Sequence, residues 1–136
     1  MVEDVAPEQT WQALADNPNA QMVDVRTDAE WTYVGLPELS ALNKRVLLIA
    51  WQAFPTGAAN PMFLQQLGAA GLTKAHDIYF ICRSGARSLA AAETARAAGY
   101  AQVYNVADGF EGPPDEQGHR GGVAGWKASG LPWRQR

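Results

Sequence analysis

Four short apolar runs, each of the kind that forms a buried strand, alternate along the chain with segments of helical patterning. The runs span residues 21–25, 43–51, 76–81 and 101–106. Helices are predicted over 7–16, from 28, over 62–71 and over 88–98, with a last helical turn at 125–130. Strands that alternate with helices in this way form a mainly parallel sheet covered on both faces. The sequence therefore predicts an α/β fold with a central, mainly parallel sheet flanked by helices.

Local signals mark where several of these helices begin. Thr27 and Glu30 have the spacing of a capping box, which starts a helix at residue 28. Asn60 and Pro61 form a good pair of cap and first-turn residue for the helix that follows them. Ser88 is predicted to be the N-cap of the alanine-rich helix over 88–98.

Composition points to a globular protein. The chain has 136 residues, 47% of them hydrophobic and 18% charged, and a single domain over residues 1–136 is predicted. No apolar run approaches the roughly 20 residues of a membrane span, and the start MVEDVAPEQTW lacks the pattern of a signal peptide. Without such a run, no membrane partner is expected. One cysteine excludes an internal disulfide, so a cytoplasmic protein is expected.

Charge and ligand-type residues narrow the possible partners. The net charge is −3, the pI is about 5.3, and the eleven basic residues are scattered, so no nucleic-acid partner is expected. Two histidines and one cysteine offer no metal-ligand spacing. Neither a metal nor another cofactor is expected.

The only cysteine opens the loop CRSGAR, between the strand over 77–81 and the helix over 88–98. Ligand sites in parallel sheets lie at the carboxyl ends of strands. A tight turn there can aim successive backbone N–H groups into one concavity, and Gly85 tolerates the positive φ that such a turn requires. The helix N-terminus also favours negative charge. The alternative is a buried structural cysteine, but the polar neighbours of Cys82 fit an anion site better than a core.

A reactive thiolate at Cys82 would need help from its surroundings. A free thiol is only a few per cent ionised at pH 7. A helix terminus contributes roughly 0.3–1 kcal/mol to an anion. The loop amides and the arginines Arg83 and Arg87 are therefore expected to supply the remaining stabilisation.

Asp24 and Arg26 lie at the same edge of the predicted sheet. A structural role is the favoured interpretation for both, and Arg26 and Glu30, four residues apart, are predicted to form a local ion pair. Trp51 and Phe54 are candidates for pocket walls, with core packing as the alternative.

The loop, with DVR at 24–26 and GWKASGLPW at 125–133, resembles the single-domain rhodanese-like sulfurtransferases, roughly from Ala6 to Trp133. The resemblance implies a rhodanese-like fold. It also implies that Cys82 accepts a sulfane sulfur from a donor such as thiosulfate and passes it to cyanide, a thiol or a protein. The implied substrate-binding residues are Arg83, Ser84, Gly85, Ala86, Arg87 and Ser88. Their amides would cradle the persulfide, the arginines would attract an anionic donor, and Asp24 and Arg26 would support the loop.

Two stretches depart from the family pattern. EWTYVGLPELS stands where the family has a G-H-I-P-G-A-like stretch and keeps only a glycine and a proline of it. The loop over 107–120 is long for a minimal rhodanese domain, and its His119 is predicted either to reach the cleft or to lie on the surface.

Two other functions remain open. A cysteine phosphatase or arsenate reductase also places a thiolate in an amide-lined loop before a helix. The phosphatase signature has its arginine six residues after the cysteine, where this chain has Ser88, whereas Arg87 comes at five. The third hypothesis is a non-catalytic rhodanese-like interaction module in which Cys82 is incidental.

Overall fold

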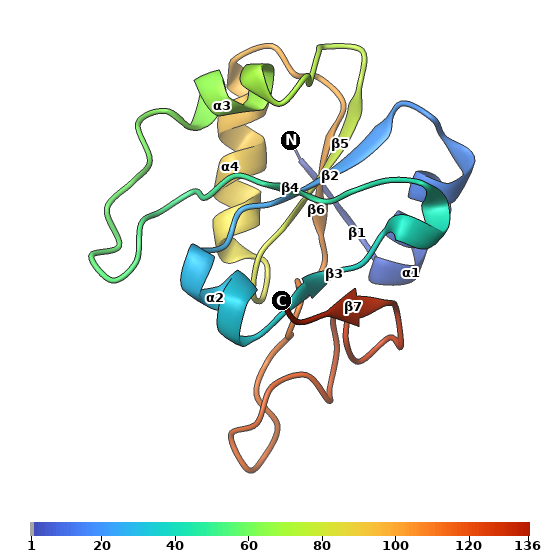
Figure 1. The fold of residues 1–136 in the computed structure, drawn as a ribbon, viewed down its shortest axis with the longest axis vertical. Helices are drawn as coiled ribbons and strands as arrows, with labels where there is room; N and C mark the ends of the chain where they lie inside the picture. The colour runs from blue at the N-terminus through green and yellow to red at the C-terminus, as the bar shows by residue number, and fades with distance from the viewer. Residues whose placement is uncertain (1) are drawn as a thin grey trace.

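The computed structural model describes residues 2–136, and a parallel sheet of five strands lies at its centre (Figure 1). The strand order is β1-β6-β5-β2-β4, and every neighbouring pair is parallel. The strands are β1 Glu3–Val5, β2 Ala20–Asp24, β4 Leu47–Leu48, β5 Asp77–Ile81 and β6 Val103–Val106. The helices are α1 Pro7–Asp16, α2 Asp28–Tyr33, α3 Phe63–Ala69 and α4 Ala86–Ala97, with a 3-10 turn η1 at Ser40–Leu42. The predicted α/β fold is confirmed.

Side chains that alternate along β5 enter two separate hydrophobic clusters, one on each face of the sheet. Ile78 and Phe80 pack with residues of α3 and α4. Tyr79 and Ile81 pack on the opposite face with residues of α1, α2 and the segment that follows β6. Because both faces are covered, β5 reads as a continuous apolar run, as expected for a central parallel strand.

The predicted strand over 43–51 is much shorter in the structure. β4 covers only Leu47–Leu48 at the edge of the sheet, where it pairs with β2 alone. Single hydrogen bonds continue the contact beyond it, from Ile49 N to Asp24 O and from Trp51 N to Val25 O. The apolar residues of this run reflect burial beside β2 rather than a long regular strand.

Helix starts agree with the sequence in one case and differ in another. The capping box of Thr27 and Glu30 is present and α2 begins at residue 28, as predicted. By contrast α3 begins only at Phe63, and Asn60 instead accepts a hydrogen bond from Met62 N in the preceding turn. Asn60 therefore stabilises the turn that precedes α3 and is not the N-cap of this helix.

The end of the chain forms a ribbon that the sequence pattern did not indicate. Residues 125–130 make a hydrogen-bonded turn, from Ser129 N to Gly125 O, without becoming an α-helix. β7, Trp133–Arg134, then pairs antiparallel with β3, Leu36–Pro37. A Cβ atom at Gly35 would approach Arg134 O to 2.9 Å, so the glycine kept from the family pattern allows the close approach of these strands.

No helix between residues 2 and 136 combines the length and the apolar character that crossing a membrane requires.

Candidate active site

Cys82 directly follows β5, at the carboxyl edge of the sheet, as predicted. Its side chain is 1% exposed and belongs to the hydrophobic cluster that α3 and α4 cover. The thiol therefore lies beneath its own loop, and the residues after it form the surface.

The loop turns into α4 two residues earlier than the sequence predicts. Gly85 is the N-cap, with φ of +117°, and the helix begins at Ala86. Ser88 is thus not the cap but a buried residue of the first turn, and its Oγ lies 3.1 Å from Cys82 Sγ. Because the N-cap is a glycine, the first N–H groups of α4 receive no hydrogen bond from a capping side chain.

The backbone of this loop presents unpaired donors. Gly85 N–H donates to Cys82 Sγ at 3.1 Å. Within residues 2–136 the N–H groups of five further loop residues have no hydrogen-bond acceptor: Arg83, Ser84, Ala86, Arg87 and Ser88. Such a set of free amides at a helix N-terminus is the geometry of an anion-binding site.

The segment 110–112 forms hydrogen bonds with the backbone of the cysteine loop. Phe110 N donates to Cys82 O at 2.7 Å, while Glu111 N and Gly112 N donate to Arg83 O at 3.0 and 3.1 Å. Gly109 has φ of +63°, and a Cβ atom there would overlap the carbonyl of Cys82. These hydrogen bonds restrain the peptide groups of Cys82 and Arg83 at the start of the loop.

Arg87 is bound to α2. Its two terminal nitrogens donate to Glu30 Oε1 and Oε2 at 2.7 and 2.9 Å. The predicted local pair of Arg26 and Glu30 is therefore wrong, because the capping box aims the Glu30 carboxylate at the loop. The bond to Glu30 raises the pKa of Arg87, although burial opposes the rise. Burial raises the pKa of Glu30, but the hydrogen bonds and charge of Arg87 outweigh it and hold that pKa below its usual value.

The lowered pKa of Glu30 makes part of the stability depend on pH. A carboxyl group with a depressed folded-state pKa stabilises the fold above its unfolded pKa of 4.5 and loses that contribution as pH falls through the folded value. Urea unfolding should therefore show wild type more stable than Glu30→Gln at neutral pH, with a difference that shrinks below pH 4.5. In an Arg87→Gln background the pH-dependent difference should be much smaller. An equal difference at all pH values would contradict the assignment.

Asp24 and Arg26 form a fully buried ion pair. Both side chains are 0% exposed, and Arg26 Nη2 lies 2.8 Å from Asp24 Oδ2. Arg26 Nε also donates to Asp24, and Nη2 donates to Gly35 O. The guanidinium stacks over Phe110, 4.3 Å from the ring centroid. The pair thereby joins the end of β2 to the segment that holds the cysteine loop.

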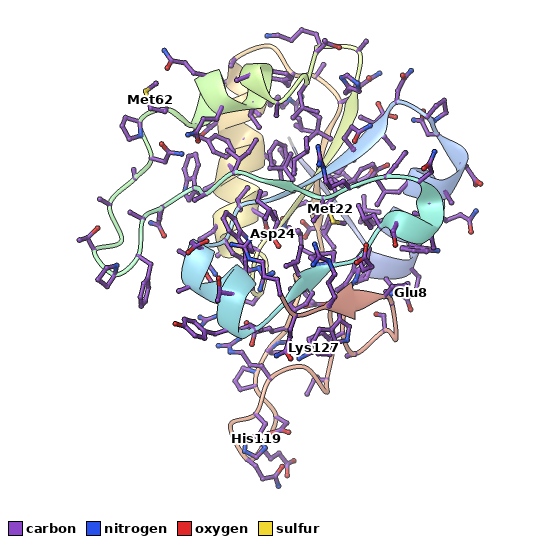
Figure 2. All side chains as sticks on the ribbon, in the orientation of Figure 1. Glu8, Met22, Asp24, Met62, His119 and Lys127 are labelled. Carbon is purple, nitrogen blue, oxygen red and sulfur yellow. The ribbon has the colours of Figure 1, made fainter. Side chains whose placement is uncertain are left out.

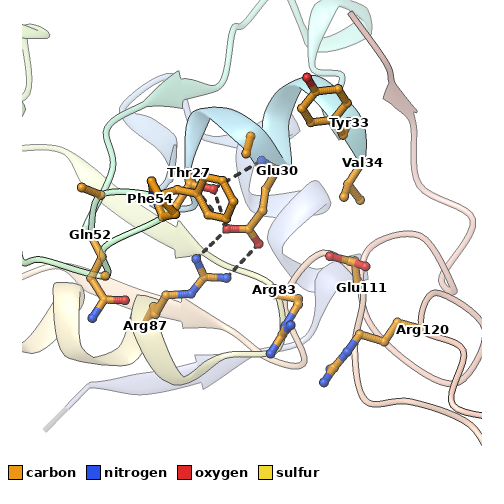
Figure 3. Close-up of a pocket in the computed structure, with 14 residues that line it drawn as sticks. Thr27, Glu30, Tyr33, Val34, Gln52, Phe54, Arg83, Arg87, Glu111 and Arg120 are labelled. Atoms are coloured by element: carbon orange, nitrogen blue, oxygen red, sulfur yellow. Dashed lines mark hydrogen bonds and ion pairs between the residues drawn. The ribbon is translucent and has the colours of Figure 1, made fainter.

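A pocket of about 610 Å³ opens beside this loop. Figure 3 shows Arg83 between Arg87 and the two residues Glu111 and Arg120. In the same view Phe54 lies near Glu30, and Tyr33 lies at the far end of α2. Phe54 is 68% and Tyr33 is 80% exposed. Trp51 does not line this pocket and packs instead on Phe63, with 5.1 Å between ring centroids.

Charge in the pocket is unevenly paired. Glu30 neutralises Arg87, whereas Arg83 has no polar partner among residues 2–136. Arg120 donates to Gly112 O at 2.7 Å, and no ion pair joins it to Glu111 in the described chain. Outside the pair of Arg87 and Glu30, the pocket is lined by Arg83 and Arg120 and by one carboxylate, Glu111. The pocket therefore has excess positive charge.

The long loop after β6 contributes to the pocket, but not through its histidine. Glu111 and Arg120 line the cavity. His119 is exposed at the far tip of this loop, well away from Asp24 at the sheet edge (Figure 2). Of the two alternatives predicted for His119, the structure shows the surface position. Among residues 2–136, no group of three or more His, Cys, Asp and Glu side chains is arranged to hold a metal ion.

Asn105 is a site residue that sequence reasoning missed. It belongs to β6, next to β5, and is 4% exposed. Its amide contacts Ser88, Gly85 and Asp4 of β1. A polar residue at the carboxyl end of a buried strand that neighbours the cysteine strand was the available signal.

Comparisons with known proteins agree with this fold. Residues 3–136 match the family model described as the STR4 middle domain, and the chain belongs to this family of rhodanese-like domains. The crystal structure of Rv0390 from M. tuberculosis is 47% identical with a TM-score of 0.89, over 99% of this chain and 98% of that one.

Two relatives at lower identity span the same length. An uncharacterized protein of Rickettsia conorii is 37% identical over 98% of both chains. A protein of Allochromatium vinosum named a sulfurtransferase is 30% identical over 97% of this chain and 94% of its own.

Proposed function

We propose that this protein is a sulfurtransferase that carries a sulfane sulfur as a persulfide on Cys82. The observation that carries the proposal is the loop after Cys82, where Gly85 N–H donates to the buried sulfur and five further N–H groups have no acceptor among residues 2–136. A persulfide or a donor anion in that loop would receive these hydrogen bonds. Nucleophilic covalent catalysis of this kind splits one transfer into two easier steps.

With thiosulfate as the donor, the two half-reactions balance. The Cys82 thiolate attacks the outer sulfur of thiosulfate, a new S–S bond forms at Cys82, the S–S bond of thiosulfate breaks, and sulfite leaves. The acceptor then attacks the outer sulfur of the persulfide. Cyanide becomes thiocyanate or a thiolate becomes a persulfide, and the Cys82 thiolate returns.

The pocket supports an organic thiol as the acceptor. Its volume of about 610 Å³ exceeds what cyanide needs and lies within the roughly 300–1,000 Å³ typical of sites for small organic molecules. Phe54 and Tyr33 offer apolar surface, and Arg83 with Arg120 can hold a carboxylate through charge-assisted hydrogen bonds. A small thiol that carries a carboxylate could place its carbon atoms against the aromatic side chains and its carboxylate at the arginines.

Intact mass spectrometry tests the proposal directly. Incubation with thiosulfate should add one sulfur to wild type, and cyanide or glutathione should remove it. Cys82→Ser should gain no sulfur under the same conditions. Hydrolysis of a phosphate ester without any sulfur adduct would instead assign the protein to the phosphatases. Absence of both, with intact binding of a partner protein, would favour a non-catalytic interaction module.

The two loop arginines should give different kinetic defects. Arg83 is exposed and has no polar partner within residues 2–136, so Arg83→Ala should raise KM for thiosulfate about tenfold, with kcat and stability little changed. Arg87 is bound to Glu30, so Arg87→Ala should lower both the melting temperature and kcat. Steady-state kinetics with thermal melts check both. Unchanged thiosulfate kinetics in Arg83→Ala would remove thiosulfate as the donor and favour an uncharged or protein-bound persulfide.

A further inference from the structure

Glu111 is a carboxylate that lines the pocket without a polar partner. Within residues 2–136 its side chain forms no ion pair and accepts no hydrogen bond. Figure 3 shows it beside Arg120, on the side of Arg83 that faces away from Arg87. Thiosulfate is a dianion that this carboxylate would repel, so donor binding does not account for the presence of Glu111 in the pocket.

Two hydrogen bonds hold Glu111 and Arg120 together at the base of the loop that follows β6. Gly121 N donates to Glu111 O at 2.7 Å, and Arg120 Nη1 donates to Gly112 O at 2.7 Å. Both charged side chains therefore start from backbone that is already organised before a ligand binds. Such preorganisation lowers the cost of binding.

The base of this loop also adjoins the cysteine loop. Glu111 N donates to Arg83 O at 3.0 Å, and Phe110 N donates to Cys82 O at 2.7 Å. A molecule held by the Glu111 and Arg120 side chains therefore lies beside the loop that carries the reactive sulfur. This position suits the acceptor of the second half-reaction, which must bring its own sulfur to the persulfide on Cys82.

Arg120 complements Glu111 in charge without forming an ion pair with it. One Arg120 nitrogen is bound to Gly112 O, and the other guanidinium N–H groups have no acceptor among residues 2–136. These groups can hold a carboxylate, and the Glu111 carboxylate can accept hydrogen bonds from an ammonium group. Two neighbouring, opposite and unpaired charges complement a zwitterion.

We propose that Glu111 and Arg120 select an acceptor thiol that carries both an ammonium and a carboxylate group, as an amino acid or short peptide with a thiol does. A thiol with a carboxylate alone would leave Glu111 unpaired beside a like charge. A thiol with an ammonium alone would leave Arg120 without an anion to bind. The inference rests on the proposed sulfur transfer and names the chemical class of its acceptor.

The transfer to such an acceptor balances without another reactant. The acceptor thiol gives its proton to the solvent, and its thiolate attacks the outer sulfur of the Cys82 persulfide. A new S–S bond forms on the acceptor, the S–S bond at Cys82 breaks, and Cys82 leaves as a thiolate. Glu111 and Arg120 keep their charges throughout, so both act through binding.

Single-turnover discharge of the Cys82 persulfide by four thiols tests the assignment, with intact mass as the readout. Cysteine carries both groups, β-mercaptopropionate only the carboxylate, cysteamine only the ammonium, and β-mercaptoethanol neither. Because the thiols differ in intrinsic reactivity, each variant is compared with wild type on the same thiol. The ratio of the two rates then reports only what the substituted side chain contributes.

The two variants should respond to different thiols. Glu111→Gln should slow discharge by cysteine and cysteamine about fivefold and should not slow discharge by β-mercaptopropionate. Arg120→Gln should slow discharge by cysteine and β-mercaptopropionate about fivefold and should not slow discharge by cysteamine. Arg120→Lys keeps the positive charge and should recover most of the rate.

Two exposed residues outside the pocket supply the controls. Glu116→Gln in the same loop and Arg96→Gln on α4 remove the same charges, and both should match wild type with all four thiols. Equal discharge by cysteine in wild type and Glu111→Gln would overturn the proposal. Slowing of β-mercaptoethanol to the same extent as cysteine would also overturn it, because the effect would then be structural.

A binding measurement separates this inference from the sulfur transfer itself. S-methylcysteine keeps the ammonium and the carboxylate but cannot accept sulfur, and an NMR titration of the backbone amide signals gives its dissociation constant. Glu111→Gln and Arg120→Gln should each weaken binding about fivefold, and Glu116→Gln should not. Binding with this pattern in a protein that never loads sulfur on Cys82 would refute only the sulfur transfer. A dissociation constant unchanged in Glu111→Gln would overturn the inference, whether or not Cys82 carries sulfur.

Discussion

Cys82→Ser is expected to abolish sulfur transfer, by about a thousandfold or more, while the protein keeps its fold. The serine hydroxyl can accept the hydrogen bond of Gly85 N–H and fills nearly the same buried space. It cannot form a persulfide, so the first half-reaction has no covalent product. Thiocyanate formation from thiosulfate and cyanide measures the activity, and circular dichroism with a thermal melt measures the fold.

A matched change in the same loop isolates the sulfur. Ser84 is exposed and its side chain has no hydrogen-bond partner among residues 2–136, so Ser84→Ala should keep most of the activity. Sulfur transfer retained in Cys82→Ser would mean that no persulfide on this residue is needed. The proposed mechanism would then be abandoned.

Asp24→Ala is expected to cost about 3–5 kcal/mol of unfolding free energy. The substitution leaves the Arg26 guanidinium buried, with Gly35 O and the Phe110 ring as its remaining contacts. For a chain of this size the loss corresponds to a melting temperature lower by about 10–20 °C. Urea denaturation and calorimetry measure both quantities.

The exposed ion pair of Asp28 and Arg136 supplies the control. Its 2.7 Å contact is close in length to that of the buried pair, but Asp28 is 80% exposed. Asp28→Ala should therefore change stability by no more than about 1 kcal/mol. Replacement of Asp24 and Arg26 together by leucine and methionine should recover much of the loss, because no unpaired charge remains. Equal effects of Asp24→Ala and Asp28→Ala would show that burial of the pair contributes nothing.

Features that depend on neighbours in the sequence were predictable. The capping box of Thr27 and Glu30 and the position of Cys82 after a central strand follow from local spacing. The parallel sheet follows from the alternation of apolar runs with helices. These signals need only short-range geometry, and they place the cysteine loop at the carboxyl edge of the sheet.

Features that depend on distant segments were not predictable from spacing. Glu30 looked like a partner for Arg26 four residues away, yet it binds Arg87, 57 residues away, because the cap turns its carboxylate toward the loop. Asn105 contacts Ser88 and Gly85 only because β6 lies beside β5 in the folded sheet. The positive φ of Gly85 moved the helix start and changed Ser88 from a cap into a contact of the sulfur.

The hydrogen bonds from the segment 110–112 to the carbonyls of Cys82 and Arg83 couple sequence changes in the loop after β6 to the geometry of the cysteine loop. The same short segment carries Glu111 of the pocket wall and is followed by the loop that carries Arg120. Any insertion or exchange of residues that reshapes the pocket from this side therefore also pulls on the peptide groups that aim the loop amides. Grafting the 107–122 loop between relatives should therefore change the pocket wall and the orientation of the loop amides together, and Gly109 and Gly112 are positions where a Cβ atom would overlap backbone atoms.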